Sequence, residues 1–343
     1  MKPTSKYITI RRMLADMNQP AYRYRQIAEA IFKHRISEFE RMTMLPKAVR
    51  EALVEAHGRR VCSVTPVLEK SSQQVSKVLF AIAGGERVEA VRLSYRGGWA
   101  SYCVSTQCGC GFGCRFCATG TIGLKRNLTA DEITDQLLHF HLHGHALDSV
   151  SFMGMGEALS NPHIFEALTV LTDPQLFALG HRRITVSTIG ILPGIDRLTR
   201  EFPQVNLTFS LHSPFDGQRS ELMPINDRFP LRDVMQALDR HIRHTGRKVY
   251  IAYILLRGIN DSAEHAEAVA SLLRGRGSGE HLYHVNLIPY NATEVTPQSY
   301  RSSDRSRMNA FVGILKSKGI HVTVRTQFGS DIQAACGQLY GSE

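Results

Sequence analysis

The segment Cys110-Gly-Phe-Gly-Cys114-Arg-Phe-Cys117 places three cysteines at C-x-x-x-C-x-x-C spacing in a glycine-rich loop. The loop comes directly after a strand-like run at residues 102–105, the first of a series in which strand and helix patterns alternate. A four-iron cubane ordinarily uses four cysteine thiolates, so three supplied together leave one iron open to bind a small molecule. The segment therefore predicts an iron–sulfur site at the end of the first strand of an α/β array.

A structural zinc site is the alternative reading of the same cysteines. Cys108 extends the run to C-x-C-x-x-x-C-x-x-C, and zinc readily takes four thiolates. Zinc knuckles, however, favour paired C-x-x-C units. The chain has seven cysteines, the others being Cys62, Cys103 and Cys336. An odd number crowded into one segment is a poor disulfide framework and is typical of a metal or redox centre in a reducing compartment.

From Ala100 onward the pattern is that of a parallel sheet covered by helices. The clearest helix opens at Thr129, where Thr129 and Glu132 form a T-x-x-E capping box. Strand-like runs occupy residues 102–105, 149–153, 184–187, 205–211, 249–256 and 283–289, and helical patterns occupy 162–171, 230–244, 262–273 and 303–317, with a last strand at 321–326. An open doubly wound sheet and an incomplete barrel both fit, and in both the functional residues lie at the C-terminal ends of strands.

The segments flanking this array suggest three further units. Residues 1–60 have apolar positions at helical spacing and a basic, aromatic stretch at 22–25, which fits either an RNA-contacting face or an ordinary solvated helix. Residues 61–98 contain a hairpin with a Gly84-Gly85 turn between strands at 75–83 and 88–95. We expect the α/β array over 99–300 and a C-terminal helix, strand and tail with Cys336 over 301–343.

Composition narrows the class of protein. Of the 343 residues, 41 are Lys or Arg and 31 are Asp or Glu, a formal net charge of +10 that fits a polyanionic partner or a solvated surface bias. The N-terminus is polar and charged, and no apolar stretch approaches the roughly 20 residues of a membrane span. We expect a cytoplasmic protein without membrane contact.

The cysteine signature resembles that of the radical S-adenosylmethionine (SAM) enzymes. Beyond the signature, further ordered motifs across nearly the whole chain resemble the ribosomal RNA adenine methyltransferases RlmN and Cfr. These motifs are Cys103-Val-Ser-Thr-Gln107, Cys117-Ala-Thr-Gly120, Asn127-Leu-Thr-Ala-Asp-Glu-Ile133, Phe152-Met-Gly-Met-Gly-Glu157, Val186-Ser-Thr188, Ser210-Leu-His212 and Ala334-Ala-Cys336-Gly-Gln338. Gln107-Cys-Gly-Cys110, Gly123-Leu-Lys-Arg-Asn127 and the tail from Gln327 are more similar to Cfr, which modifies carbon 8 of adenine, than to RlmN, which modifies carbon 2.

The resemblance implies a fold and a cofactor site. The fold is a radical SAM partial (β/α)6 barrel with a small N-terminal helical domain and a C-terminal extension. Cys110, Cys114 and Cys117 would hold a [4Fe-4S] cluster whose open iron binds the amino and carboxylate groups of SAM, with two SAM molecules used per turnover. The implied SAM contacts are Gly156, Glu157, Ser187, Ser210, Leu211, His212 and Asn291. For His212 alone, a satisfied core histidine is the alternative.

The chemistry explains why two further cysteines belong to such a site. An adenine C–H is too weakly acidic for a side-chain base and too electron-poor to attack a sulfonium methyl, whereas a radical can act on a methyl carried by a protein sulfur. By the resemblance, Cys336 carries that methyl and Cys103 releases the product by forming a disulfide with it. Glu89 would accept the ring proton, although a solvent-facing strand carboxylate would look the same and Glu86 is a near alternative.

The resemblance also implies the partners. The substrate would be adenosine 2503 of 23S rRNA, methylated at carbon 8 in the peptidyl-transferase centre, with resistance to antibiotics that bind there. A one-electron donor such as flavodoxin would serve an enzyme that acts as a monomer. The adenine must leave its stack, and basic residues such as Lys125, Arg126, Arg182 and Arg183 could hold flanking phosphates. Competing hypotheses are RlmN-type carbon 2 methylation that extends to transfer RNA, a zinc-stabilised RNA-binding protein without catalysis, and a radical enzyme acting on a peptide.

Overall fold

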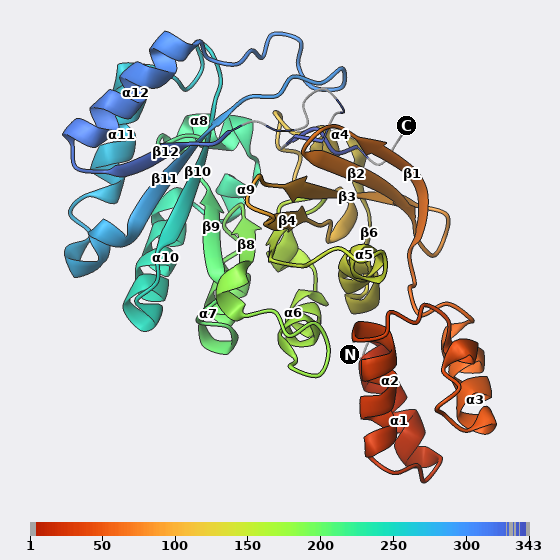
Figure 1. Ribbon diagram of the computed structural model, residues 1–343. Coiled ribbons are helices and arrows are strands. Elements are labelled where there is room, and N and C mark those ends of the chain that lie inside the picture. Colours follow the sequence, from red (N-terminus) through yellow and green to blue (C-terminus); the bar gives the residue numbers. More distant parts are fainter. Residues whose placement is uncertain (1–4, 327, 329–331, 333, 336, 341–343) are drawn as a thin grey trace.

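A computed structural model describes residues 5–326, 328, 332, 334–335 and 337–340 (Figure 1). Cys336, expected to carry the methyl group, lies outside the described residues. The chain is built around one ten-stranded sheet in the order β1-β2-β3-β4-β7-β8-β9-β10-β11-β12, with a separate two-stranded sheet of β5 and β6.

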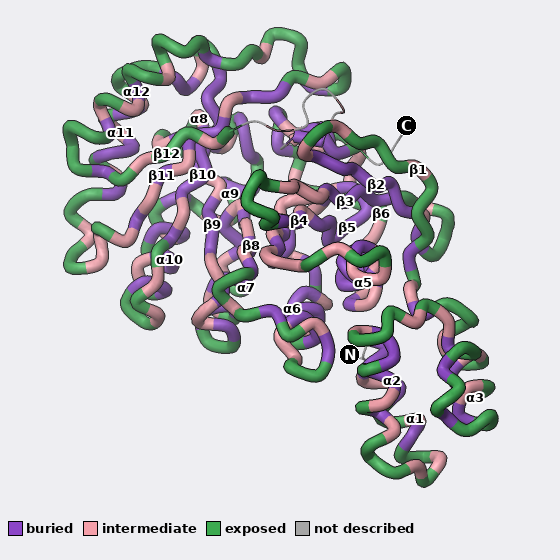
Figure 2. Tube along the Cα trace, in the orientation of Figure 1, coloured by how far each residue is buried: buried purple, intermediate pink, exposed green. Residues whose placement is uncertain are grey.

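Six parallel strands form the predicted partial (β/α)6 barrel. They are β4 (Ala100–Cys103), β7 (Ser149–Phe152), β8 (Ile184–Thr188), β9 (Asn206–Ser210), β10 (Val249–Leu255) and β11 (Tyr283–Pro289). The predicted last strand, β12 (His321–Val324), pairs with β11 and is also parallel. Buried residues concentrate along these strands, as Figure 2 shows, because helices cover the outer face of the sheet.

The helices follow the expected amphipathic segments. They are α5 (Ala130–Leu142), α6 (Ile164–Thr172), α7 (Leu192–Glu201), α10 (Leu231–Thr245), α11 (Ala263–Leu273) and α12 (Arg305–Ser317), with the short helices α4 (Ala118–Ile122), α8 (Asp216–Leu222) and α9 (Ile225–Arg228). The capping box is confirmed, since Thr129 Oγ1 accepts from the Glu132 amide at 3.1 Å and Glu132 Oε2 accepts from the Thr129 amide at 3.0 Å. Helices α4, α7, α8 and α9 were not predicted. Short 3₁₀ segments are η1 (Phe39–Arg41), η2 (Ala158–Ser160), η3 (His181–Arg183) and η4 (Gly277–Leu282).

An antiparallel extension precedes the barrel. The predicted hairpin is present as β2 (Val75–Ala81) and β3 (Arg87–Ser94), and β3 continues antiparallel onto β4. The edge strand β1 (Thr65–Ser71) was not predicted, because it begins Thr-Pro and has almost no buried side chain. The pair β5 (Gln107–Cys110) and β6 (Gly123–Asn127) was also missed, and it closes the base of the cysteine loop.

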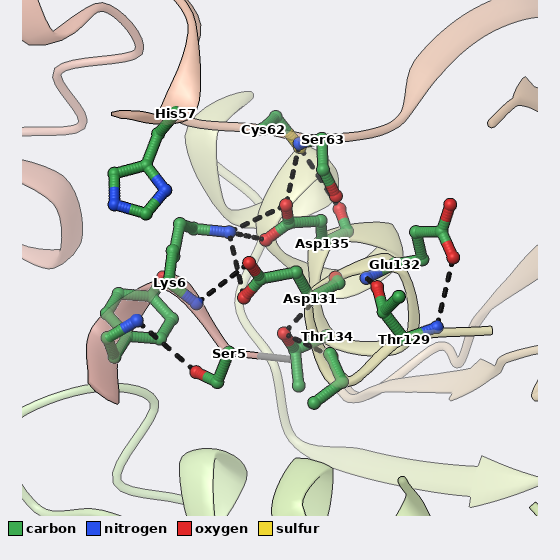
Figure 3. Close-up of polar contacts among 12 residues, drawn as sticks. Ser5, Lys6, His57, Cys62, Ser63, Thr129, Asp131, Glu132, Thr134 and Asp135 are labelled. Carbon is green, nitrogen blue, oxygen red and sulfur yellow. Dashed lines mark hydrogen bonds and ion pairs between the residues drawn. The ribbon is translucent and has the colours of Figure 1, made fainter. Parts of the chain in front are cut away.

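Three N-terminal helices, α1 (Lys6–Asp16), α2 (Tyr22–Phe32) and α3 (Lys47–His57), pack around a second apolar cluster that also includes Leu138 of α5 and Val170 of α6. Their polar junction with α5 is drawn in Figure 3: Lys6 Nζ lies 2.6 Å from Asp135 Oδ1 and 3.5 Å from Asp131 Oδ1. The Asp135 carboxylate also accepts from the Ser63 amide at 2.7 Å. Burial alone would lower the pKa of Lys6, but the two carboxylates raise it above its ordinary value, so this buried ammonium is charged. No helix among the described residues has the length and apolar character to cross a membrane.

Candidate active site

The three signature cysteines line one cavity of about 170 Å³ inside the curved sheet. The C-terminal ends of the parallel strands supply the opposite walls, as the alternating pattern predicted. Of the predicted residues, this cavity is lined by Cys110, Cys114, Cys117, Gly156, Glu157, Ser187, Ser210 and His212. We call it the cluster cavity.

Short local contacts position the cysteine loop. Cys110 ends β5 opposite Gly123 of β6, and the Cys117 amide donates to the Cys114 carbonyl at 3.1 Å just before α4. Burial, followed by the charge of Cys117, raises the pKa of Cys110 to about 12 and that of Cys114 well above its usual range. Buried thiols of this kind ionise only with a positive partner, which bound iron supplies.

The donor set fits a cubane better than zinc. Among the residues that the structure describes, no three His, Cys, Asp or Glu side chains converge on a point where one metal ion could sit. Tetrahedral zinc needs such convergence, whereas the three thiolates of a cubane bind three different irons. Cys108, which zinc would need as a fourth ligand, is buried with its thiol 3.5 Å from the Arg87 carbonyl oxygen.

The glycine-rich turn after β7 brings Glu157 into the cluster cavity. Gly156 has φ +95° and a Cβ there would lie 2.4 Å from Gln107 Cβ, so only glycine fits. Gln107 Oε1 accepts from the Glu157 amide at 2.8 Å. The Glu157 carboxylate accepts from the amides of Leu159 at 3.1 Å and Ile189 at 2.9 Å.

Glu157 is suited to bind a cation. Burial raises the pKa of its carboxyl to about 7, and hydrogen bonds from Thr188, Ile189 and Leu159 only partly oppose that effect. A buried carboxylate is stabilised most by an opposite charge, and the ammonium of an amino acid provides one.

His212 is a neutral hydrogen-bonding group in the same cavity. It has φ +55°, and its Nδ1 accepts from the Ile254 amide at 3.0 Å, which places the ring proton on Nε2. Burial, followed by the charge of Arg219, lowers the pKa of His212 to about 3. The ring therefore does not ionise at neutral pH and can only donate or pack, here edge-on to Phe116 at 4.7 Å between centroids.

Arg219 of α8 is a buried charge that no sequence motif indicates. Its guanidinium is fully buried and donates to the carbonyls of Ile189 at 2.8 Å and of Leu211 and Ser210 at 3.2 Å each. Burial lowers its pKa to about 10, against the raising effect of Cys114 and Asp216, so it remains a cation beside the cysteine loop. A lone arginine in a short helix has no spacing pattern that marks it.

Two predicted SAM contacts do not line the cluster cavity. Leu211 is fully buried, with its amide donating to the Ala252 carbonyl at 3.0 Å and its own carbonyl held by Arg219. Asn291 lines a second, smaller cavity instead. Leu211 is therefore buried outside the cluster cavity, and Asn291 lies in the neighbouring cavity.

The second cavity, of about 50 Å³, contains Cys103 and adjoins the cluster cavity. Met153, Ile288 and Arg325 line both. We call it the thiol cavity. Ala335 lines the thiol cavity and Gly337 lines the cluster cavity, so the described neighbours of position 336 in the sequence reach both.

Glu89 is buried rather than solvent-facing, which rules out the alternative of an exposed strand carboxylate. Its Oε1 lies 2.8 Å from Lys77 Nζ, and its Oε2 accepts from the Tyr340 amide at 2.9 Å. On β3, Glu89 is two residues from Val91, which pairs with Cys103, so all three point to one face of the sheet. Glu86 instead pairs with Arg126 at 3.4 Å.

The described part of the C-terminal tail is held against the cysteine loop. The Gly337 carbonyl accepts from the Ala118 amide at 3.0 Å, and the Leu339 carbonyl accepts from Thr119 Oγ1 at 2.6 Å. Together with the Tyr340 contact to Glu89, these bonds connect α4, the tail and β3. The tail therefore borders both cavities.

Comparison with known proteins agrees with this geometry. Residues 104–270 match the model of the radical SAM superfamily. Proteins named ribosomal RNA large subunit methyltransferase Cfr are 60% identical in Lachnoclostridium phytofermentans and 61% identical in Clostridium botulinum strain Loch Maree, each over 99% of this chain and 98% of theirs. The chain belongs to the Cfr family of radical SAM methyltransferases. A crystal structure of a radical SAM methyltransferase from Sphaerobacter thermophilus is 39% identical and superposes with a TM-score of 0.91 over 99% of this chain and 98% of that one.

Membership of the Cfr family decides between the competing hypotheses at the level of class. The chain is a radical SAM enzyme that uses a [4Fe-4S] cluster and SAM, so a zinc-stabilised protein without catalysis is excluded. The cysteine loop, Glu157 and the neutral His212 are the described groups that fit those cofactors.

Proposed function

We propose that this protein methylates carbon 8 of adenosine 2503 in 23S rRNA by way of a methyl group carried on Cys336. The observation that carries the proposal is the pair of adjoining cavities, one lined by the three signature cysteines and the other by Cys103. The names of relatives at about 60% identity support large-subunit ribosomal RNA as the substrate. Methylation at that position would give resistance to antibiotics that bind the peptidyl-transferase centre.

The cofactor contacts follow from the cluster cavity. Cys110, Cys114 and Cys117 hold the cluster, and Glu157 binds the amino group of SAM, with Gly156, Ser187, Ser210 and His212 along the rest of the molecule. When bound, the two cofactors supply the methyl group and one-electron chemistry, with the electron provided by a donor such as flavodoxin. Leu211 contributes to the SAM site through its backbone, and Asn291 contributes from the neighbouring thiol cavity.

The thiol cavity supplies the steps that follow. Cys336 holds the one-carbon unit that bonds to the adenine, and Glu89 takes the proton that leaves the ring carbon. Buried beside Lys77, the Glu89 carboxylate keeps a fixed position on the face that it shares with Cys103. The Cys103 thiolate then attacks the Cys336 sulfur, the bond between that sulfur and the methylene carbon breaks, and the carbon takes up a proton to become the methyl group, so the disulfide stays on the protein and the methylated base is released.

Nucleoside analysis tests the position of methylation. Reconstituted protein is incubated with SAM, a reductant and unmodified 23S rRNA, and the digested RNA is separated by chromatography with mass detection. We expect 8-methyladenosine. The appearance of 2-methyladenosine alone would assign RlmN-type activity, and RNA without any methyladenosine would overturn the proposal as a whole.

A further inference from the structure

The single tryptophan, Trp99, lies on the surface just before β4, at the opposite end of that strand from the cysteine loop. Trp99 ends the turn between β3 and β4, and 43% of its surface is exposed. The turn is fixed by the Tyr95 amide, which donates to the Trp99 carbonyl at 2.8 Å, and by the Gly98 amide, which donates to the Tyr95 carbonyl at 3.0 Å. Tyr95 itself is 40% exposed. A large apolar ring held on a rigid, exposed turn offers a flat face to a partner.

A cation already lies over this ring. The Arg183 guanidinium carbon is 5.7 Å from the centroid of Trp99. The contact follows from the sheet, because β4, β7 and β8 are neighbours and Ser101 pairs with Ser149 while Val150 pairs with Ile184. Trp99 and Arg183 therefore stand at the N-terminal ends of nearby parallel strands.

More basic residues continue along the same edge of the sheet. The Arg182 carbonyl accepts from Asn206 Nδ2 at 2.7 Å, and Asn206 Oδ1 accepts from Arg247 Nη2 at 2.6 Å, so the contacts run from η3 past β9 to the start of β10. We define the basic edge as Arg96, Trp99, Arg182, Arg183, Arg247 and Lys248. Its acidic neighbour Asp148 accepts from the Ala100 amide at 2.8 Å.

The dimensions suit a nucleic acid strand. From β4 to β10 the sheet order has four intervals, which at about 4.8 Å each span about 19 Å. That is the length of roughly five stacked nucleotides at about 3.4 Å each. Exposed aromatic rings stack on unpaired bases, and arginines spaced along a groove bind the phosphates.

We propose that the basic edge is a second RNA-binding surface, on which Trp99 stacks on an unpaired base and Arg182 and Arg183 bind its flanking phosphates. The inference rests on the proposed function, since it takes ribosomal RNA as the ligand. It adds a contact at the N-terminal ends of the strands, whereas the cofactors and the reacting adenine occupy the C-terminal ends. Of the basic residues considered from the sequence, Arg126 is unsuitable because Glu132 binds it at 2.7 Å.

The single tryptophan makes a direct experiment possible. Because the chain contains one Trp, its emission reports on position 99 alone. The holoenzyme is titrated with a synthetic stem–loop that carries adenosine 2503, and separately with heparin, a polyanion without bases. We expect saturable quenching by the RNA and none by heparin. Unchanged emission while labelled RNA is bound, or equal quenching by heparin, would overturn the inference.

Variants separate stacking from charge. Trp99→Ala should weaken binding of the labelled stem–loop about tenfold and Trp99→Phe much less, since stacking on Phe persists. Arg183→Gln should lower the slope of log affinity against log salt by about 0.7 to 0.9. Arg197→Gln is the matched control, because that exposed arginine is already paired with Glu201 at 2.8 Å. Methylation at saturating RNA is measured in parallel. If wild type methylates the RNA but Trp99→Ala binds it normally, the proposed function stands and the proposed RNA-binding role of the basic edge is wrong.

Discussion

Replacing Glu157 by glutamine tests whether this carboxylate binds the amino group of SAM. Glutamine keeps the shape of the side chain and removes its charge. A carboxylate and an ammonium about 4 Å apart attract by about 4 kcal/mol at an effective dielectric constant of about 20. Removing one partner of a buried charge pair costs about 2 to 5 kcal/mol, so the Kd for SAM should rise by about thirtyfold to about four-thousandfold.

The same substitution has a predictable structural side effect. Both Glu157 oxygens accept from backbone amides, of Leu159 and Ile189, so a glutamine NH2 group faces one of those amides without an acceptor. The unfavourable contact costs about 1 to 3 kcal/mol of folding free energy. A modest fall in Tm is therefore expected, with unchanged iron content because the three cysteines remain.

The assay is equilibrium binding of SAM to reconstituted protein, measured by calorimetry on wild type and variant. Glu267→Gln on the exposed part of α11 is the matched control and should bind SAM normally. A Kd for Glu157→Gln within threefold of wild type, at full iron content, would show that Glu157 does not bind the ammonium. The turn after β7 would then have only a structural role.

Three further predictions concern the cluster and the junction of the N-terminal helices. Cys114→Ala should lose iron and SAM cleavage, since a cluster with three thiolates has none to spare; wild-type iron content would contradict the assignment. Asp135→Ala leaves Lys6 buried beside a single carboxylate and should lower the free energy of unfolding, measured in urea, by about 3 to 5 kcal/mol. Glu51→Ala, which removes one partner of an exposed ion pair, is the control and should change it by less than about 1 kcal/mol. Burial raises the pKa of Asp131 from 3.8 to about 6, against the lowering effect of Lys6. The stability that the protonated Asp131 contributes is therefore present below about pH 4 and is lost as the pH rises through 6. Between pH 4 and 7 wild type should lose stability relative to Asp131→Asn, and parallel pH curves for the two proteins would refute this.

Much of the barrel was predictable because its elements have strong local patterns. The capping box at Thr129 marks α5, the run of β10 is continuously apolar or aromatic, and β11 begins with alternating buried and half-buried residues. The elements that were missed have weak patterns. Helix α7 begins Leu-Pro-Gly, and β1 is an exposed edge strand that exists because β2 offers it hydrogen bonds. Tertiary context, which no short window contains, determines both.

The functional site likewise contains features that local sequence predicts and features that depend on tertiary contacts. The cysteine spacing and the turn at Gly156 were sufficient to place the cluster cavity, because each depends on a local loop geometry. The burial of Glu89 beside Lys77 and Tyr340 could not be predicted, since Tyr340 is 251 residues away in the sequence. Arg219 was missed for a related reason: apart from the Asn226 side chain, its partners are backbone carbonyls, including those at the ends of β8 and β9, and every residue has a carbonyl.

The central claim is that the one-carbon unit reaches adenine on Cys336 and leaves through attack by Cys103, and the mass of the protein after reaction tests it most directly. Cys103→Ala, Cys336→Ala and wild type are incubated with SAM, reductant and the RNA stem–loop, denatured, digested with nuclease and protease, and analysed by mass spectrometry. Cys103→Ala should accumulate a nucleotide joined through a methylene bridge to the peptide around Cys336, and Cys336→Ala should carry neither methyl nor adduct. Normal turnover by Cys103→Ala, without an adduct, would contradict the account.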